Sequence, residues 1–182
     1  PAAPGEWEAA GREKSHPELF SKYSVFALTA FDPPGQARSI ADNTRANIEM
    51  WSTLKDALEQ EDLHPRAIHK SFGINAKENW REDGFCVAFD PQHANLARAV
   101  VLKVAKAFKQ GAIFEYYPDS ASSQLKRATI PTDPAEPVTV TMMQFASSLE
   151  LVDNQEEPGT ELLQRTARGL VARAWVGPGE LR

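Results

Sequence analysis

The chain has 182 residues, of which 42% are hydrophobic and 25% are charged, and such proportions are typical of a globular protein rather than a disordered one. Its net charge of −5 argues against a general nucleic-acid binder, which needs a basic surface to neutralise phosphates. No apolar run reaches the ~20 residues that a membrane helix needs, and the single cysteine, Cys86, excludes an intrachain disulfide.

Residues 1–23 have few regular patterns and are interrupted by three prolines and two glycines. We expect an N-terminal arm here, and two interpretations stay open: a tail on or near its own domain, or an arm that grips a partner. The chain begins with Pro-Ala-Ala-Pro-Gly. This start is compatible with a soluble protein of an organelle after removal of a targeting peptide, or with a cytoplasmic protein.

The first half of the core contains a strand, a helix and a weaker strand. Residues 24–31 are rich in Val, Phe, Leu and Thr and predict a central strand, which Asp32-Pro-Pro-Gly ends. Ser39 is a good helix N-cap, and apolar residues then recur at helical spacing, so we expect a helix over 40–60. Residues 67–74 predict a strand at a sheet edge.

The second half of the core contains a polar connection, a strand, a helix and a last strand. Residues 75–83 read as a polar connection containing Trp80, and 84–89 as a strongly apolar strand in which Cys86 is a buried thiol. Asp90 and Pro91 are typical of the N-cap and first position of a helix, and the apolar stripe that follows extends to Phe108. Residues 112–117 predict a fourth strand.

This order of elements predicts an α+β fold of the ferredoxin-like split β-α-β type (βαββαβ), with a four-stranded antiparallel sheet and two helices on one face. The expected spatial order of the strands is four, one, three, two, which places the two most apolar strands in the middle. We therefore divide the chain into an arm over 1–23, a core domain over 24–117 and a C-terminal extension over 118–182.

The extension contains a loop over 118–137 with a short strand at 126–130, and a second strand at 138–145 that is either added to an edge of the sheet or flanks the core. A helix over 160–174 and a tail follow. We expect this extension and the N-terminal arm to contact other protein subunits.

No catalytic motif is present: there is no nucleophile elbow, phosphate loop or dinucleotide glycine pattern. The four histidines are scattered without metal-ligand spacing, so we expect no metal and no cofactor. Lys103, Lys106 and Lys109 form a basic strip that is most simply a solvated face. A regulatory nucleic-acid contact through this strip is a third and weaker hypothesis.

The predicted topology gathers polar residues at one end of the sheet, where the first strand ends and the third begins. We expect Asp32, Asn43, Trp80, Glu82 and Gln110 to meet there, beside a helix N-terminus that favours an anionic group. Two interpretations stay open: these residues form a small polar binding pocket, or Asn43 and Trp80 only lock the two loops together.

The same residues carry a resemblance to a known family. Phe-Ala-Leu-Thr-Ala-Phe-Asp-Pro-Pro-Gly from 26 to 35, Ser39 with Asn43, and Trp-Arg-Glu-Asp-Gly-Phe from 80 to 85 are three of its parts. Phe-Lys-Gln-Gly-Ala-Ile-Phe-Glu from 108 to 115 is the fourth. Together they resemble domain-of-unknown-function family 3293 over residues 24–117, although Asp32 stands where that family has asparagine. The resemblance implies a small α/β domain and no established activity.

The sequence therefore favours a non-catalytic protein-binding or structural module. Such a module would be an accessory subunit of a larger complex, in an organelle or elsewhere. The alternative is a small-molecule binding domain or modest enzyme that uses the polar pocket.

Overall fold

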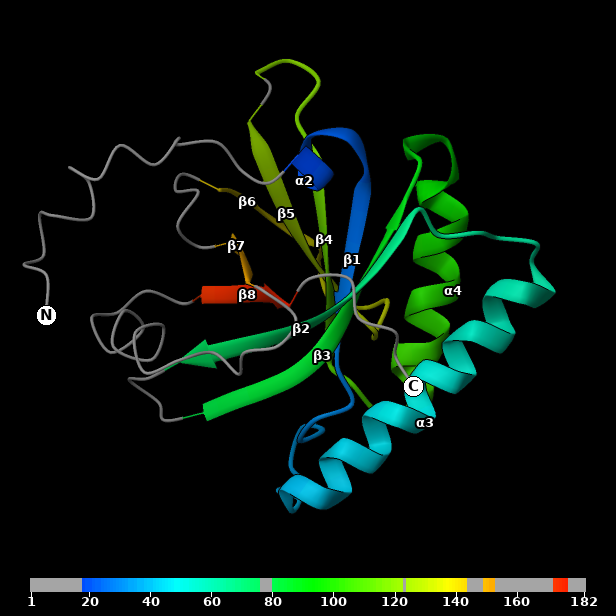
Figure 1. Ribbon diagram of the computed structural model, residues 1–182, viewed down its shortest axis with the longest axis vertical. Helices are drawn as coiled ribbons and strands as arrows, with labels where there is room; N and C mark the ends of the chain where they lie inside the picture. The colour runs from blue at the N-terminus through cyan, green and yellow to red at the C-terminus, as the bar shows by residue number, and fades with distance from the viewer. Residues whose placement is uncertain (1–17, 76–79, 123, 144–148, 153–171, 177–182) are drawn as a thin grey trace, which may run out of the picture.

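The computed structural model describes residues 18–75, 80–122, 124–143, 149–152 and 172–176, and their strands form one eight-stranded sheet (Figure 1). The strand order is β6-β5-β4-β1-β3-β2-β8-β7. The helices are α2 (Glu18–Lys22), α3 (Ile40–Gln60), the 3-10 turn η1 (Pro91–His93) and α4 (Ala94–Ala107). The strands are β1 (Ser24–Leu28), β2 (Ala67–Asn75), β3 (Trp80–Phe89), β4 (Ala112–Pro118), β5 (Leu125–Pro131), β6 (Thr139–Met142), β7 (Leu149–Val152) and β8 (Ala172–Val176).

The expected α+β class and antiparallel pairing are confirmed, but the sheet has more than four strands. The four expected strands are neighbours in the order β4-β1-β3-β2. Beyond β4 the sheet continues antiparallel into β5 and β6, and beyond β2 it continues into β8 and β7, which pair parallel to each other. Strand β5 pairs with β4 along its whole length. Ala112 lies opposite Pro131 at one end, and Pro118 lies opposite Leu125 at the other.

The sheet is strongly curled. β6 and β7 are at opposite ends of the strand order, and a flat sheet of this width would separate them by roughly 33 Å. Met143 and Leu149 are only six residues apart in the chain, which can span at most roughly 22 Å. Figure 1 accordingly shows β6, β7 and β8 on the same side of the molecule.

The two faces of the sheet carry separate apolar clusters. On one face α3 and α4 pack side by side over β1, β3 and β4, with Met50, Leu54 and Val101 fully buried. On the other face α2 inserts Phe20, whose ring meets Tyr116 of β4 edge-on at 5.4 Å. Residues 18–22 are thus fastened to the sheet, because Phe20 is a buried aromatic side chain.

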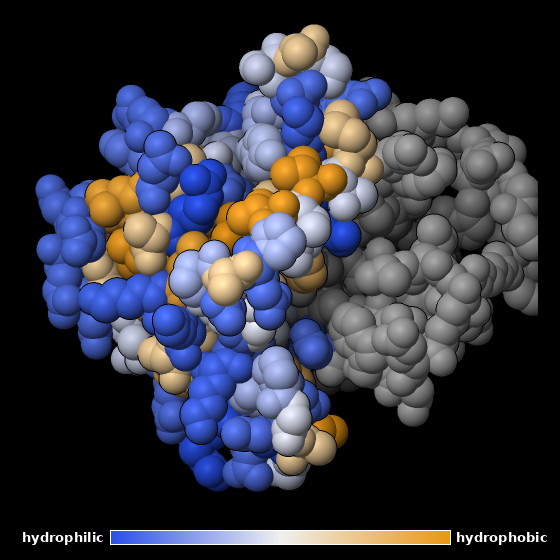
Figure 2. All heavy atoms as spheres, turned by 180° about the vertical axis from the view of Figure 1, so that it is seen from behind, coloured by the Kyte–Doolittle hydropathy of each residue, from blue (hydrophilic) through white to orange (hydrophobic). Residues whose placement is uncertain are grey.

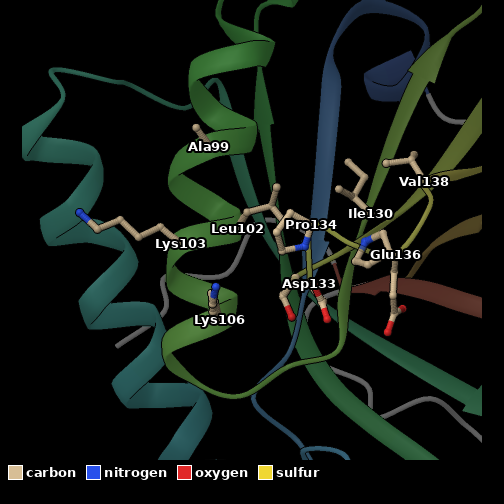
Figure 3. Close-up of a pocket in the computed structure, with 11 residues that line it drawn as sticks. Ala99, Leu102, Lys103, Lys106, Ile130, Asp133, Pro134, Glu136 and Val138 are labelled. Carbon is tan, nitrogen blue, oxygen red and sulfur yellow. The ribbon is translucent and has the colours of Figure 1, made fainter.

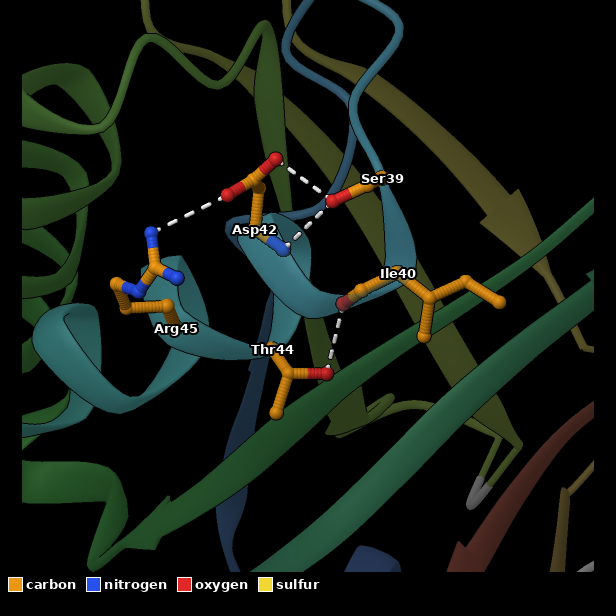
Figure 4. A network of polar contacts seen from close by, with 5 residues as sticks. All are labelled: Ser39, Ile40, Asp42, Thr44 and Arg45. Atoms are coloured by element: carbon orange, nitrogen blue, oxygen red, sulfur yellow. Dashed lines mark hydrogen bonds and ion pairs between the residues drawn. The ribbon is translucent and has the colours of Figure 1, made fainter.

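Helix α3 begins where its capping residues predict. The Ser39 hydroxyl accepts a hydrogen bond from the Asp42 amide at 3.1 Å and donates one to the Asp42 carboxylate at 2.6 Å (Figure 4). Arg45 lies one turn further on and reaches the other Asp42 oxygen at 3.2 Å. The N-cap therefore satisfies one of the unpaired amides of the first turn, and the expected bounds of 40–60 are confirmed.

Other expected bounds are wrong in detail. The first strand ends at Leu28, because the residues after it bond to α3 and to β3 instead. The third strand begins at Trp80, since residues 80–83 continue the ladder with β2. Asp90 and Pro91 do occupy the N-cap and the first position of η1, as expected. The Asp90 side chain makes no capping hydrogen bond, and its carboxylate lies 2.7 Å from the guanidinium of Arg66.

The expected helix over 160–174 lies mostly outside the described residues. Its last three residues, 172–174, belong to strand β8, so a helix that extends to Ala174 is wrong. Most of the expected arm, residues 1–17, also lies outside the described part of the chain.

Candidate functional site

The turn after β1 is held by two hydrogen bonds between Asp32 and Asn43 of α3. The Asp32 amide donates to Asn43 Oδ1, and Asn43 Nδ2 donates to Asp32 Oδ1, both at 3.0 Å. The Arg38 amide donates to the same Asp32 oxygen at 2.8 Å. Asp32 has a φ of +30°, a conformation that Asp and Asn tolerate better than most residues.

Asn47, one turn after Asn43, links the same turn to β3. Its Oδ1 accepts from the Ala30 amide at 2.7 Å, and its Nδ2 donates to the Asp83 carbonyl at 2.7 Å. The Thr29 hydroxyl donates to that carbonyl as well, at 2.6 Å. Sequence reasoning missed Asn47 and Thr29, although the spacing of Asn43 and Asn47 by four residues already places them on one face of the helix.

Gln110 reaches the turn from the other side. It is buried after α4, and its Nε2 donates to the Phe31 carbonyl at 3.1 Å. Asp32, Asn43 and Gln110 therefore gather around a single loop, residues 29–38. We call these three residues, with Thr29 and Asn47, the turn cluster.

Trp80 and Glu82 lie on strand β3 rather than in a loop. Glu82 is opposite Gly73, and Trp80 is opposite Asn75 at the end of the β2–β3 hairpin. Trp80 precedes Asp83 by three residues, and three residues span roughly 10 Å along a strand. The backbone thus carries Trp80 away from the turn cluster, towards the end of the β2–β3 hairpin.

The turn cluster uses most of its polar atoms internally. The hydrogen bonds from Asn43 and from the Arg38 amide lower the pKa of Asp32 below its ordinary value of 3.8, so this carboxylate is ionised at neutral pH. Asn43 is 2% exposed and both its oxygen and its nitrogen are bonded to Asp32. Such an arrangement orders the turn; a role in ligand binding stays a prediction.

A second region lies on the helix-covered face, where α4 borders β5 and β6. Two adjoining depressions of about 470 Å³ and about 450 Å³ share Ile130 and Val138, so they are consecutive sections of one groove. Leu102 of α4 forms one wall, and Ile130 of β5 lies opposite it (Figure 3). We call this the α4–β5–β6 groove.

The register of β4, β5 and β6 determines which side chains form the floor of the groove. Ala128 pairs with Glu115 of β4 on one side and with Val140 of β6 on the other, so these side chains point towards the helix layer. Val138 and Val140 remain 55% and 54% exposed. Seen from behind, hydrophobic residues gather near the middle of the described surface (Figure 2).

An ion pair borders the groove. Arg98 of α4 donates from Nε and Nη2 to the two carboxylate oxygens of Glu115, at 2.7 Å and 3.0 Å, and from Nη1 to Asn95. Glu115 is 2% exposed, so its charge is removed from water and depends on this bidentate partner. Glu115 also raises the pKa of the Arg98 guanidinium above its ordinary value. The pair joins α4 to β4.

Two further features of the described residues bear on function. No three or more His, Cys, Asp or Glu side chains among them are grouped so as to hold a metal ion. Within the same ranges, no helix has the length and apolar character required to cross a membrane.

The fold and the two regions define an α+β domain with a largely antiparallel sheet that extends beyond four strands. Residues 28–113 match the model of the family described as Protein of unknown function (DUF3293), and this segment of the chain is a domain of that family. The match lies within the resembling stretch of 24–117 and spans the turn cluster and α4. No match was found among curated proteins or among solved structures.

Proposed function

We propose that the protein is a non-catalytic protein-binding module that acts as an accessory subunit of a larger assembly. The observation that carries the proposal is the open apolar floor of the α4–β5–β6 groove, with Val138 and Val140 more than half exposed. Contiguous exposed apolar side chains beside a groove commonly mark a surface for another macromolecule.

The proposal gives the C-terminal extension a specific part. Strands β5 and β6 belong to residues 118–182, the segment expected to contact partners. β5 supplies Ile130, β6 supplies Val140, and Val138 directly precedes β6. The same expectation for residues 1–23 stands as part of the proposal.

The alternative, a small-molecule binder or modest enzyme at the turn cluster, has less support. Asn43 and Gln110 already bond to the turn, and no residue of the turn cluster lines either section of the α4–β5–β6 groove. The organising role of these residues accounts for their burial without a ligand.

We also propose that the middle of the sheet is a ferredoxin-like split β-α-β unit that has gained strands at both edges. The order β4-β1-β3-β2 and the position of α3 and α4 on one face support this assignment. On this interpretation β5 and β6 are an addition that widens the helix-side face.

The test is affinity recovery of partners from extracts of the source organism with the whole chain as bait. Val140→Asp places a charge on the groove floor and is expected to abolish recovery of a specific partner. Ile48→Asp is the matched control, because Ile48 is an aliphatic residue of α3 that is 59% exposed away from the groove. Equal recovery by both variants would contradict the proposal.

A further inference from the structure

The helix layer has room for one more helix. α3 packs against β3, and α4 packs against β1 and β4, whereas no described helix covers β5 and β6 on this face. Neighbouring strands lie about 4.8 Å apart, so two strands provide about 10 Å of floor. Packed helices lie about 8–10 Å apart, so the α4–β5–β6 groove has the width of one helix.

The groove suits the apolar stripe of an amphipathic helix. Leu102 projects from α4 on one side, and Ile130, Val138 and Val140 form the sheet side. An amphipathic helix buries such a stripe while its two flanks remain polar. The charged residues beside the groove then determine which charges the two flanks of a bound helix should carry.

The α4 wall is basic. No Asp or Glu occurs between Pro91 and Phe114, whereas Arg98, Lys103, Lys106 and Lys109 all lie in this stretch. The charge of Arg98 is balanced by Glu115, so the positive charge of the wall comes from Lys103 and Lys106, which both line the groove. Neither lysine forms an ion pair with any described residue. A chain with a net charge of −5 thus presents one locally positive wall, which favours an acidic flank on the occupant.

The connection between β5 and β6 provides the opposite charge. Asp133 and Glu136 are exposed and line the section of the groove that Lys106 also lines (Figure 3). These carboxylates favour a basic residue where the occupant passes the connection.

We infer that the groove binds an amphipathic helix of a partner protein, with an acidic flank along α4 and a basic residue beside Asp133 and Glu136. The helix forms a third member of the layer beside α3 and α4. This inference rests on the proposed protein-binding function and specifies the class of its partner.

A fluorescent synthetic peptide of about the length of α4 is the probe. It has a leucine stripe, glutamates on the flank that faces α4 and a lysine on the other flank near one end. The control peptide has the same composition with every glutamate and lysine exchanged. Fluorescence anisotropy with the whole chain should show binding of the first peptide at least about tenfold tighter than the second, a difference of about 1.4 kcal/mol.

Variants separate the floor from the charges. Val138→Glu should weaken the first peptide at least about tenfold, whereas Ile48→Glu, on exposed α3 surface, should leave it unchanged. Lys106→Glu should reduce or reverse the preference between the two peptides, because it changes the charge of the α4 wall without changing the floor. Circular dichroism confirms that each variant is folded.

Three results would overturn the inference: no binding of the first peptide by the whole chain, equal binding of both peptides, or equal effects of Val138→Glu and Ile48→Glu. A dimer in sedimentation that Val138→Glu dissociates would make a second copy of the chain the occupant and overturn it too. If the peptides fail while Val140→Asp still abolishes partner recovery, the protein-binding function stands and only the helical partner is wrong.

Discussion

At the residue scale, the turn after β1 is held by the side-chain amides of Asn43, Asn47 and Gln110. Asn43 is the central one, since it donates to the Asp32 carboxylate and accepts from the Asp32 amide. Asparagine suits this position because its side chain carries one donor and one acceptor. Its removal would leave both Asp32 groups without these partners.

The first prediction concerns that asparagine. Asn43→Ala should lower the free energy of unfolding by about 1–3 kcal/mol, because it removes two hydrogen bonds, one of them to a carboxylate. Urea denaturation followed by circular dichroism measures the change. Glu49→Ala, on the exposed surface of the same helix, is the control and should change stability by less than about 0.5 kcal/mol. Equal effects would mean that Asn43 does not hold the turn.

The second prediction concerns Asp32, whose folded-state pKa lies below its ordinary value of 3.8. The carboxylate therefore adds stability above pH 3.8, and this contribution is lost as the pH falls through the folded-state pKa. Asp32→Asn removes this titration, and Asn tolerates the positive φ. The variant should lose less stability than the wild type between about pH 6 and about pH 3 in urea denaturation. Parallel pH profiles would contradict the assignment.

At the element scale, the strands and helices are positioned by close backbone approaches as well as by apolar stripes. Gly84 shows this most clearly, because a Cβ added there would overlap the Leu28 carbonyl and approach Thr29 at 3.1 Å. β1 and β3 can approach this closely because residue 84 has no side chain. The same approach places the Asp83 carbonyl within reach of Thr29 and Asn47.

The third prediction follows from this contact. Gly84→Ala should destabilise the protein by about 1–3 kcal/mol, because the obstructing atoms belong to the backbone of β1 and cannot move away cheaply. Gly111→Ala is the matched control: its added Cβ would meet only the Pro34 ring, at an ordinary 3.4 Å. Thermal unfolding by calorimetry compares the two, and a similar melting temperature for both variants would rule out the proposed clash.

At the scale of the whole molecule, the C-terminal extension is part of the sheet. β5 covers the outer edge of β4 and adds Leu125, Ala128 and Ile130 to the two buried clusters. Val140 of its partner β6 and Val138, which directly precedes β6, are the exposed valines of the α4–β5–β6 groove. The segment that widens the sheet is thus the one that creates the candidate interaction surface.

The fourth prediction tests that dependence with two fragments that begin at residue 18. A fragment that ends at residue 143 should unfold cooperatively on heating, whereas one that ends at residue 118 should not, because the edge of β4 and the core beside it are then exposed. Circular dichroism measures both transitions. A cooperative transition of equal midpoint in the shorter fragment would show that the core needs neither β5 nor β6.

The sequence alone determined the parts that depend on local patterns. The apolar stripe and the Ser39 cap specify α3 from residue 40 to residue 60, and short apolar runs specify most of the central strands, since these patterns and capping act within a few residues. Simple rules for connecting strands also brought Asp32, Asn43 and Gln110 to one end of the sheet, where the structure has them around one loop.

Only the tertiary structure decided the features that depend on distant pairings. The sequence could not show that β5 and β6 would extend β4, that Trp80 would continue a hairpin, or that Arg98 would find Glu115. Each contact joins residues whose partner is chosen by the register of the whole sheet, and a local pattern does not encode that choice. The α4–β5–β6 groove arises in the same way, because its walls come from a helix and two strands that the chain brings together only on folding.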